Sequence, residues 1–375
     1  MTTRERILKL LNYEKPDRVP AVLFGFWREL LDEWEEQGVV KNGFAKAWGF
    51  RNEADYEILG MLGADCHWSC FWGGNEFLSP PFEYKVIEKR ADGVILQQNG
   101  YGVIEAVKPG LASIPGEHDY LLKDRGSFEK YYKHRLQPDP SRVDLKHLQD
   151  CWNKRDKNQP FGIWLGSLLG KTREMLTLTG ISYLMADDED LFAEICDMVG
   201  EICYTNAKIT LEYAKNHGIV FDHAGYWEDI CFKNGPLLSP AAFERYCGKH
   251  YKRINGFCRG YGIKYISLDC DGVIDMLVPT WLNNGVNVMF PLEVGVWGDQ
   301  FEAARKKYGK NFLGVGSMDK TALRKDKAAV DEELKRVQKL IKLGGYVPCP
   351  DHLLMPGTKF ELVKYYFEKL KELSL

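Results

Sequence analysis

One short run of this sequence brings three side chains with metal-binding chemistry close together. Residues 344–352 have the sequence Gly-Gly-Tyr-Val-Pro-Cys-Pro-Asp-His, and an apolar segment typical of a strand ends inside the run. The Cys349 thiol, the Asp351 carboxylate and the His352 imidazole therefore lie within four residues of one another. Sulfur, oxygen and nitrogen ligands of this kind suit a divalent metal, above all zinc.

A second run of the same character lies about eighty residues upstream. Residues 265–272 have the sequence Tyr-Ile-Ser-Leu-Asp-Cys-Asp-Gly, so Asp269, Cys270 and Asp271 also stand at the end of an apolar segment. The carboxyl ends of barrel strands meet at one rim, where the reactive side chains of barrel enzymes lie. We therefore expect the two runs to form one site. Asp269 could instead cap the following helix, and His352 could be a neutral rim residue.

The elements that must position these runs follow a repeating pattern. Apolar runs rich in β-branched residues end in turn residues, and amphipathic helical patterns separate them. The expected strands are residues 19–24, 64–70, 161–165, 219–223, 264–269, 286–291, 312–316 and 345–349. Alternating strands and helices imply parallel strands joined by right-handed crossovers. We therefore predict an α/β fold, a TIM (β/α)8 barrel, with an N-terminal helical extension that ends at Tyr13.

One region departs from this alternation. Residues 83–107 alternate polar and apolar side chains around Ala-Asp-Gly at 91–93 and Asn-Gly at 99–100, which are turn sequences typical of hairpins. We expect a β-hairpin insertion there, after the second strand and over the mouth of the barrel. No linker rich in glycine, serine or proline divides the chain, so residues 1–375 are predicted to form a single domain.

The other predicted strand ends carry acidic and aromatic side chains. These rim residues are Phe24, Trp27, Trp68, His223, Tyr226, Trp227, Glu228, Asp229 and Glu293. Aromatic side chains at a rim suit a flat, apolar substrate, and the carboxylates suit acid–base work or a metal. Each residue also has an ordinary structural explanation. Single aromatic residues are most often part of the core, and Glu228 and Asp229 could be first-turn acids of a helix.

The composition limits the possible functions. Hydrophobic residues make up 45% and charged residues 27% of the 375 residues, which favours a large core over disorder. The formal net charge of −3 offers no bulk attraction to nucleic acid or to an anionic membrane. No apolar run of about 18 residues and no signal-peptide core are present, so we expect a cytoplasmic protein. The ten cysteines are then expected to be reduced.

Several motifs together resemble the uroporphyrinogen decarboxylase-like superfamily of barrels. They are Thr-Arg-Glu-Arg at 3–6, Lys-Pro-Asp-Arg-Val-Pro at 15–20, Trp-Glu-Asp at 227–229, Gly-Pro-Leu-Leu-Ser-Pro at 235–240, Pro-Leu-Glu-Val at 291–294 and Gly-Gly-Tyr-Val-Pro at 344–348. Porphyrinogen decarboxylation itself is disfavoured. The decarboxylase has an arginine-rich loop after its first strand, whereas this chain has Arg28 there, followed by Glu29.

The cobalamin-dependent methyltransferase branch of the superfamily is more similar. In that branch zinc is held by a His-x-Cys motif at one strand end and by a cysteine near the C-terminus. The corresponding places in this chain are the Asp-Cys-Asp run and the neighbourhood of His352. The resemblance implies a zinc site of Asp269, Asp271 and His352, with Cys270 and Cys349 as alternates. Oxygen ligands make zinc a harder Lewis acid, which favours methyl ethers over thiols as substrates.

The resemblance thus implies a methyltransferase of the O-demethylase type. Zinc would bind the ether oxygen of a methoxylated, aromatic donor, and the cobalamin of a separate corrinoid protein would accept the methyl group. This chain has no Asp-x-His-x-x-Gly corrinoid-binding motif, so the cobalt must come from that partner. The implied roles are proton donation by Glu228 or Asp229, ring positioning by His223 and Tyr226, and apolar walls from Phe24, Trp27, Trp68 and Trp227.

Two other interpretations stay open at this point. The first is a metal-assisted decarboxylase of the same superfamily, which would act without a corrinoid partner. The second is a non-catalytic protein that binds a corrinoid or a tetrapyrrole. A homodimer is the default expectation for the oligomeric state.

Overall fold

The core of the fold is a seven-stranded parallel sheet. The computed structural model describes residues 1–69, 72–108, 115–298 and 301–374. The strand order is β15-β14-β13-β12-β9-β8-β3. The bounds of these strands are β3 Trp72–Gly73, β8 Gly162–Gly166, β9 His223–Trp227, β12 Tyr265–Asp269, β13 Val288–Leu292, β14 Leu313–Met318 and β15 Tyr346–Pro350. Parallel pairing brings the carboxyl ends of all seven strands to one edge of the sheet.

Two further short strands lie beside the ends of this sheet. Strands β1 (Val22–Leu23) and β2 (Cys66–His67) pair in parallel, and β2 precedes β3 in the same stretch of chain. After β15, Leu354 forms a parallel bridge with Phe26, which follows β1. The predicted α/β fold with parallel strands is confirmed. Closure of these strands into an eight-stranded barrel stays a prediction.

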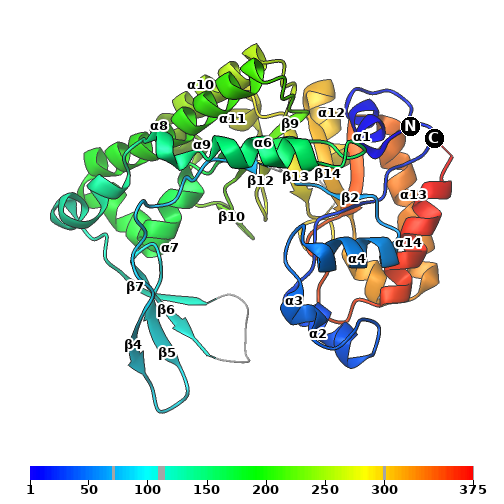
Figure 1. The fold of residues 1–375 in the computed structure, drawn as a ribbon, viewed down its shortest axis with the longest axis horizontal. Helices are drawn as coiled ribbons and strands as arrows, with labels where there is room; N and C mark the ends of the chain where they lie inside the picture. Colours follow the sequence, from blue (N-terminus) through cyan, green and yellow to red (C-terminus); the bar gives the residue numbers. More distant parts are fainter. Residues whose placement is uncertain (70–71, 109–114, 299–300, 375) are drawn as a thin grey trace.

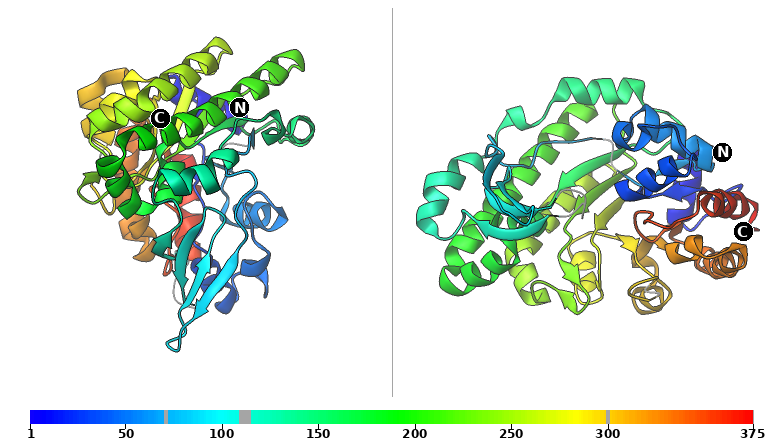
Figure 2. Two further views of the ribbon diagram at one scale, coloured as in Figure 1. Left: turned by 90° about the vertical axis from the view of Figure 1, so that its left-hand side faces the viewer. Right: turned by 90° about the horizontal axis from the view of Figure 1, so that it is seen from below.

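Helices lie outside the strands (Figures 1 and 2). Their bounds are α1 Thr3–Leu11, α2 Arg28–Glu36, α3 Phe44–Ala47, α4 Glu53–Leu62, α5 Arg125–Ser127, α6 Leu145–Lys154, α7 Leu169–Asp187, α8 Glu189–Asn216, α9 Pro240–Phe243, α10 Lys249–Gly260, α11 Val278–Asn283, α12 Phe301–Tyr308, α13 Lys327–Leu343 and α14 Phe360–Glu372. The N-terminal helix α1 is fixed by a capping box, in which the Thr2 side chain bonds the Glu5 backbone and the Glu5 carboxylate bonds the Thr2 backbone. No helix in the described ranges is long and apolar enough to cross a membrane.

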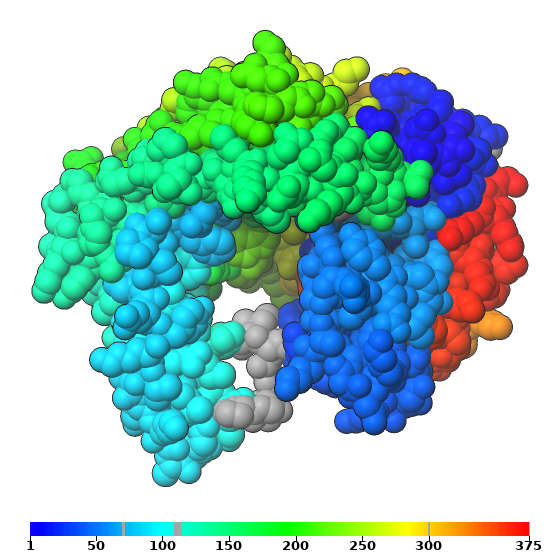
Figure 3. Space-filling model, viewed as in Figure 1, coloured from blue at the N-terminus to red at the C-terminus, as the bar shows by residue number. Residues whose placement is uncertain are grey.

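The insertion after β3 is an antiparallel sheet in the order β4-β5-β6-β7. Its strands are β4 Lys85–Lys89, β5 Ile95–Gln98, β6 Val103–Val107 and β7 Gly116–Tyr120. The hairpin expected at 83–107 corresponds to β4, β5 and β6, and β7 adds a fourth strand. The sheet projects from the body on the same side as α2 and α3 (Figure 1). The space-filling view shows the molecule hollowed between these two segments (Figure 3).

One predicted strand is displaced almost completely from the observed one. The run 219–223 is not a strand, and β9 begins at His223 and ends at Trp227. The preceding residues are held by a side chain instead, because the Asp222 carboxylate accepts bonds from the Phe161 N–H at 2.9 Å and from Arg4. His223 therefore lies at the start of its strand rather than at the rim.

Candidate metal centre

Three side chains from three strand ends meet in one cluster. Asp271 follows β12, Glu293 follows β13 and His352 follows β15, and one ligand atom from each lies within 4.8 Å of the other two. The Nε2 atom of His352 lies 3.0 Å from Oδ2 of Asp271. We call Asp271, Glu293 and His352 the triad.

Local backbone and ring contacts fix the triad. Gly272 has φ +87°, and a Cβ there would lie 2.6 Å from the Cys231 carbonyl oxygen, so the turn after Asp271 requires glycine. The Gly272 N–H donates to Glu293 Oε2 at 3.0 Å, and Trp297 Nε1–H donates to the same oxygen at 2.8 Å. The His352 ring packs against Trp27, with the ring centroids 6.2 Å apart.

The electrostatics of the triad suit a cation. Among the described residues, Oδ1 of Asp271 is buried and has no hydrogen-bond partner. An unpartnered, buried carboxylate oxygen is costly unless something positive binds it. Burial and the charge of Asp271 raise the pKa of Glu293, although the Gly272 N–H, His352 and Trp297 act in the opposite direction. A divalent ion would satisfy both carboxylates, and two oxygens with one imidazole nitrogen form a hard donor set.

An aromatic cavity of about 170 Å³ lies next to the triad. Its lining residues are Phe24, Phe50, Trp68, Ser69, Trp164, His223, Gly225, Tyr226, Ser267, Asp269 and Phe290. Phe24 joins the two regions, because its ring centroid lies 5.6 Å from that of His352 and 4.5 Å from that of Phe290. Within the cavity the Trp68 ring stacks on His223 at 4.8 Å. Burial lowers the pKa of His223 to about 4, so its imidazole is neutral near pH 7.

Comparison with known proteins identifies the family. The model of the uroporphyrinogen decarboxylase (URO-D) family matches residues 170–373, which is more than half of the chain. The chain belongs to the URO-D family. The resemblance found in the sequence is thereby confirmed. A methyltransferase from Methanosarcina mazei superposes with a TM-score of 0.58 and 14% identity, over 99% of this chain and 98% of that chain. At this identity the likeness shows a shared fold alone. No curated protein matches the chain.

The structure of this URO-D family protein brings together two of the three predicted ligands. Asp271 and His352 belong to the triad, whereas Asp269 lines the cavity instead. Burial and the charges of Asp271, Asp229 and Glu293 raise the pKa of Asp269 well above its ordinary value. Glu293 was expected at the rim but not as a ligand.

The two alternate cysteine ligands lie outside the triad. Cys270 and Cys349 are buried, and burial raises the pKa of both thiols, which disfavours the thiolate that a metal needs. The Cys270 sulfur accepts a bond from the Ile230 N–H at 3.4 Å. Asp351 also lies outside the triad, and its Oδ2 accepts the N–H groups of Val294 and Gly295, each at 2.8 Å.

The predicted aromatic residues divide between the cavity and its surroundings. Phe24, Trp68, His223 and Tyr226 line the cavity, and Phe50, Trp164 and Phe290 were not anticipated. The Tyr226 hydroxyl donates to Asn255 Oδ1 at 2.8 Å, so its ring rather than its oxygen is offered to the cavity. Trp227 lies outside the cavity lining, with its ring centroid 5.3 Å from Lys171 Nζ.

Glu228 has a structural role rather than the predicted role of proton donor. Its carboxylate is fully buried and accepts the N–H groups of Leu168 at 2.9 Å and Gly170 at 2.6 Å, together with the Tyr251 hydroxyl. It therefore caps the N-terminus of α7 and holds β9 against that helix. A carboxylate occupied by these donors, and outside both the cavity and the triad, is not available to a substrate.

Asp229, unlike Glu228, interacts electrostatically with two members of the triad, Asp271 and His352. Its Oδ2 lies 3.1 Å from Arg173 Nη1, and its side chain is about one-third exposed at 32%. Burial raises the pKa of Asp229; Arg173 lowers it, the Asp271 charge raises it further, and His352 lowers it. Asp229 therefore stays a candidate proton donor at the rim.

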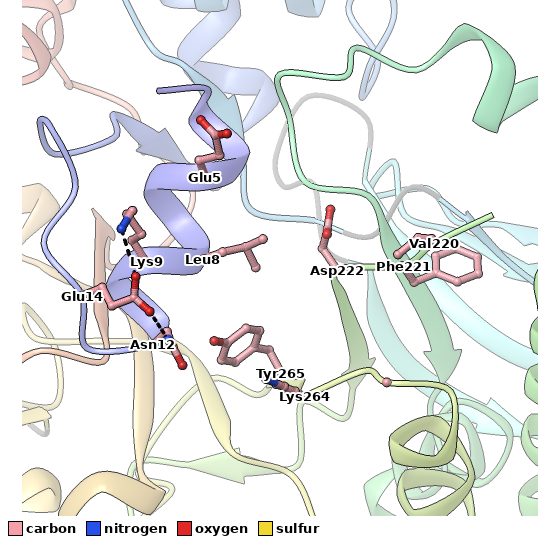
Figure 4. A pocket seen from close by; sticks show the side chains of 11 residues that line it. Glu5, Leu8, Lys9, Asn12, Glu14, Val220, Phe221, Asp222, Lys264 and Tyr265 are labelled. Carbon is pink, nitrogen blue, oxygen red and sulfur yellow. Dashed lines mark hydrogen bonds and ion pairs between the residues drawn. The ribbon is translucent and has the colours of Figure 1, made fainter. Parts of the chain in front are cut away.

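A second hollow lies at the opposite ends of the strands. This groove has a volume of about 430 Å³ and lies between α1 and the residues around the starts of β9 and β12. Figure 4 shows the side chains that line it. Three of its charged side chains form ion pairs, since Lys9 bonds Glu14 at 2.9 Å and Asp222 bonds Arg4. In barrel enzymes the reactive groups lie at the carboxyl ends of the strands, whereas the amino ends contribute to stability.

Proposed function

We propose that this URO-D family protein is a zinc-dependent methyltransferase. It would move a methyl group from a small methoxylated aromatic donor to the cobalt of a separate corrinoid protein. The observation that carries the proposal is the triad beside an aromatic cavity. The family match further supports a closed barrel in which β1 and β2 complete the ring of strands. The nine described cysteines are free thiols, which supports a cytoplasmic location.

The triad has the ligands for a catalytic metal. Asp271, Glu293 and His352 would hold the ion through two carboxylates and an imidazole. When bound, the ion would act as a Lewis acid on the ether oxygen and make the aryl oxide a better leaving group. Three protein ligands leave a coordination position for that oxygen, as in other catalytic zinc sites.

The cavity has the size and chemistry for the aromatic ring of the donor. A cavity of about 150 Å³ can hold a benzene-sized molecule, and this cavity measures about 170 Å³. The rings of Trp68 and Phe290 would form adjoining apolar walls for the donor ring, and Phe24 would direct it towards His352. These apolar walls also exclude water from the reacting ether.

Asp229 would protonate the departing oxygen. Because burial raises its pKa, the carboxyl holds a proton at higher pH than an exposed aspartate does. Arg173 bonds both the Asp229 side chain and its carbonyl oxygen, and it would hold the carboxyl at the rim.

Porphyrinogen decarboxylation receives no support from the site. Arg28 is the arginine after β1, and its Nη1 donates to the Ala45 carbonyl oxygen at 2.9 Å. The cavity lining among the described residues contains no arginine or lysine, whereas a substrate with many carboxylates needs a dense set of them.

The experiment is a methyl-transfer assay with a reduced corrinoid protein and simple methoxyarenes, with 2-methoxyphenol first. Wild-type protein loaded with zinc should methylate the cobalt, and the absorbance of the corrinoid should change accordingly. Asp271→Ala should lose the reaction, and Cys349→Ser is the matched control that should keep it. Full activity in Asp271→Ala, or turnover of a small carboxylate without the corrinoid protein, would overturn the proposal.

A further inference from the structure

A buried lysine lies beside Glu293, one of the three residues of the triad. The Lys320 side chain is 7% exposed, and it comes from the segment that follows β14. Its Nζ lies 3.9 Å from Glu293 Oε1 and 3.8 Å from Asp351 Oδ1. A buried ammonium thus faces two buried carboxylates, one of which belongs to the triad.

The lysine contributes charge to this arrangement rather than geometry. Both distances from Nζ exceed a normal hydrogen bond. Glu293 is already oriented by the Gly272 and Trp297 N–H groups, and Asp351 accepts three backbone N–H groups, including that of Lys320 itself at 3.1 Å. Neutral donors therefore fix both carboxylates, and what Lys320 adds is a unit of positive charge in a site of low exposure.

That charge and a divalent ion would neutralise the same carboxylate. Asp271 and Glu293 give the triad two acidic groups, and the charge of Asp271 also raises the pKa of the nearby Asp229 and Asp269. Without a metal, Lys320 offsets the repulsion among these groups. With a metal, the ammonium repels the ion across Glu293. At partly buried sites such interactions are worth several-fold to a hundredfold in affinity.

We propose that Lys320 is the built-in counter-charge of the metal centre. It stabilises the metal-free protein, weakens the binding of a divalent ion, and keeps the bound ion electron-poor. The inference rests on the metal centre of the proposed function. An electron-poor ion withdraws more charge from an ether oxygen, so the weaker binding has a chemical benefit.

The test compares Lys320→Met, which keeps the length and removes the charge, with Lys320→Arg, which keeps the charge. Zinc affinity is measured by competition with a chromophoric chelator, and thermal midpoints are measured with and without zinc. Lys320→Met should bind zinc on the order of tenfold or more tightly than wild type, and its metal-free midpoint should fall. Lys320→Arg should stay near the wild type in both measurements. Simple structural damage would weaken zinc binding, so the direction of change separates the two explanations.

A second variant keeps the test decisive if Lys320→Met does not fold. Asp351→Asn removes one negative charge and leaves the lysine in place, and it should weaken zinc binding several-fold. Unchanged or weaker zinc binding in folded Lys320→Met, or tighter binding in Asp351→Asn, would overturn the role of Lys320 while leaving the metal centre standing. A wild type that binds no zinc would instead remove the metal centre of the proposed function, and this inference with it.

Discussion

Among the described residues, two of the three aspartate–histidine pairs have equal length and different surroundings. Asp55 and His67 lie 3.0 Å apart near α4, and Asp271 and His352 lie 3.0 Å apart at the carboxyl ends of the strands. Asp55 is fully buried, and its other bonds come from Trp48 Nε1–H and the Arg51 N–H, each at 2.8 Å. By contrast, Asp271 Oδ1 has no partner among the described residues.

The difference shows that neighbouring donors, rather than the pair itself, decide which site can bind a ligand. Burial would raise the pKa of Asp55, but the His67 bond and charge and the Arg51 and Trp48 donors outweigh it and hold the pKa below the ordinary value. Those donors occupy the lone pairs that a metal would need. Around Asp271 the neighbours are acids, and a cation would be stabilised there.

The largest expected effect comes from breaking the Asp55–His67 pair. We call it the saturated pair because both Asp55 oxygens accept bonds, although His67 Nδ1 has no partner among the described residues. Asp55→Ala leaves His67 and the Trp48 and Arg51 N–H groups without their acceptor. Removing one partner of a buried, charged pair costs about 3–5 kcal/mol of unfolding free energy. Urea denaturation monitored by circular dichroism would measure this loss. Zinc content per folded chain should stay at the wild-type value, and loss of zinc at full stability would contradict the structural role of Asp55.

We call Asp271 and His352 the open pair, because Asp271 Oδ1 has no partner among the described residues. Breaking it should reduce zinc binding and leave stability nearly unchanged. His352→Ala removes one of three ligands, so zinc affinity should fall by more than the roughly 10- to 100-fold that outer-shell changes cause. The unfolding free energy of the metal-free variant should change by about 1 kcal/mol or less, because His352 is partly exposed and alanine removes only its bond to Asp271 and its ring contacts with Trp27 and Phe24. A large loss of stability with zinc binding retained would reverse the assignment of the two pairs.

Lowering the pH should reduce the stability that Asp55 contributes and so distinguish the saturated pair from the open pair. Its folded-state pKa is lowered, so its stabilising contribution is fully present above the ordinary pKa of 3.8 and is lost as pH falls through the lower folded value. The stability difference between wild type and Asp55→Asn should therefore be constant above pH 3.8 and narrow below it. Denaturant curves at several pH values measure the difference. A gap that widens in acid would contradict the lowered pKa.

The smallest effect is expected at the thiols that the family pattern suggested as ligands. Cys349→Ser should change zinc affinity by no more than about twofold, because Cys349 is buried outside the triad and residues without shared partners act nearly independently. Chelator competition measures the change. A loss approaching that of His352→Ala would place sulfur among the ligands after all.

The position of the site could be predicted from the sequence because its residues follow predicted strands. Contacts with residues far away in the sequence could not be predicted. Asp271 and His352 follow predicted strands, so their meeting could be anticipated. Asp269 is the last residue of β12 and Asp271 lies beyond the strand, so strand alternation does not place both side chains in one site. Glu228 resembles a rim acid until Leu168, sixty residues away in sequence, is seen to donate to it.

The central claim is that the open pair binds a metal and the saturated pair does not. The most direct measurement is zinc per folded chain, by mass spectrometry, in the wild type and in the His352→Ala and Asp55→Asn variants. The account predicts one zinc in the wild type and in Asp55→Asn, and almost none in His352→Ala. No zinc in a wild type purified without chelator and then loaded with zinc, or an undiminished content in His352→Ala, would contradict it.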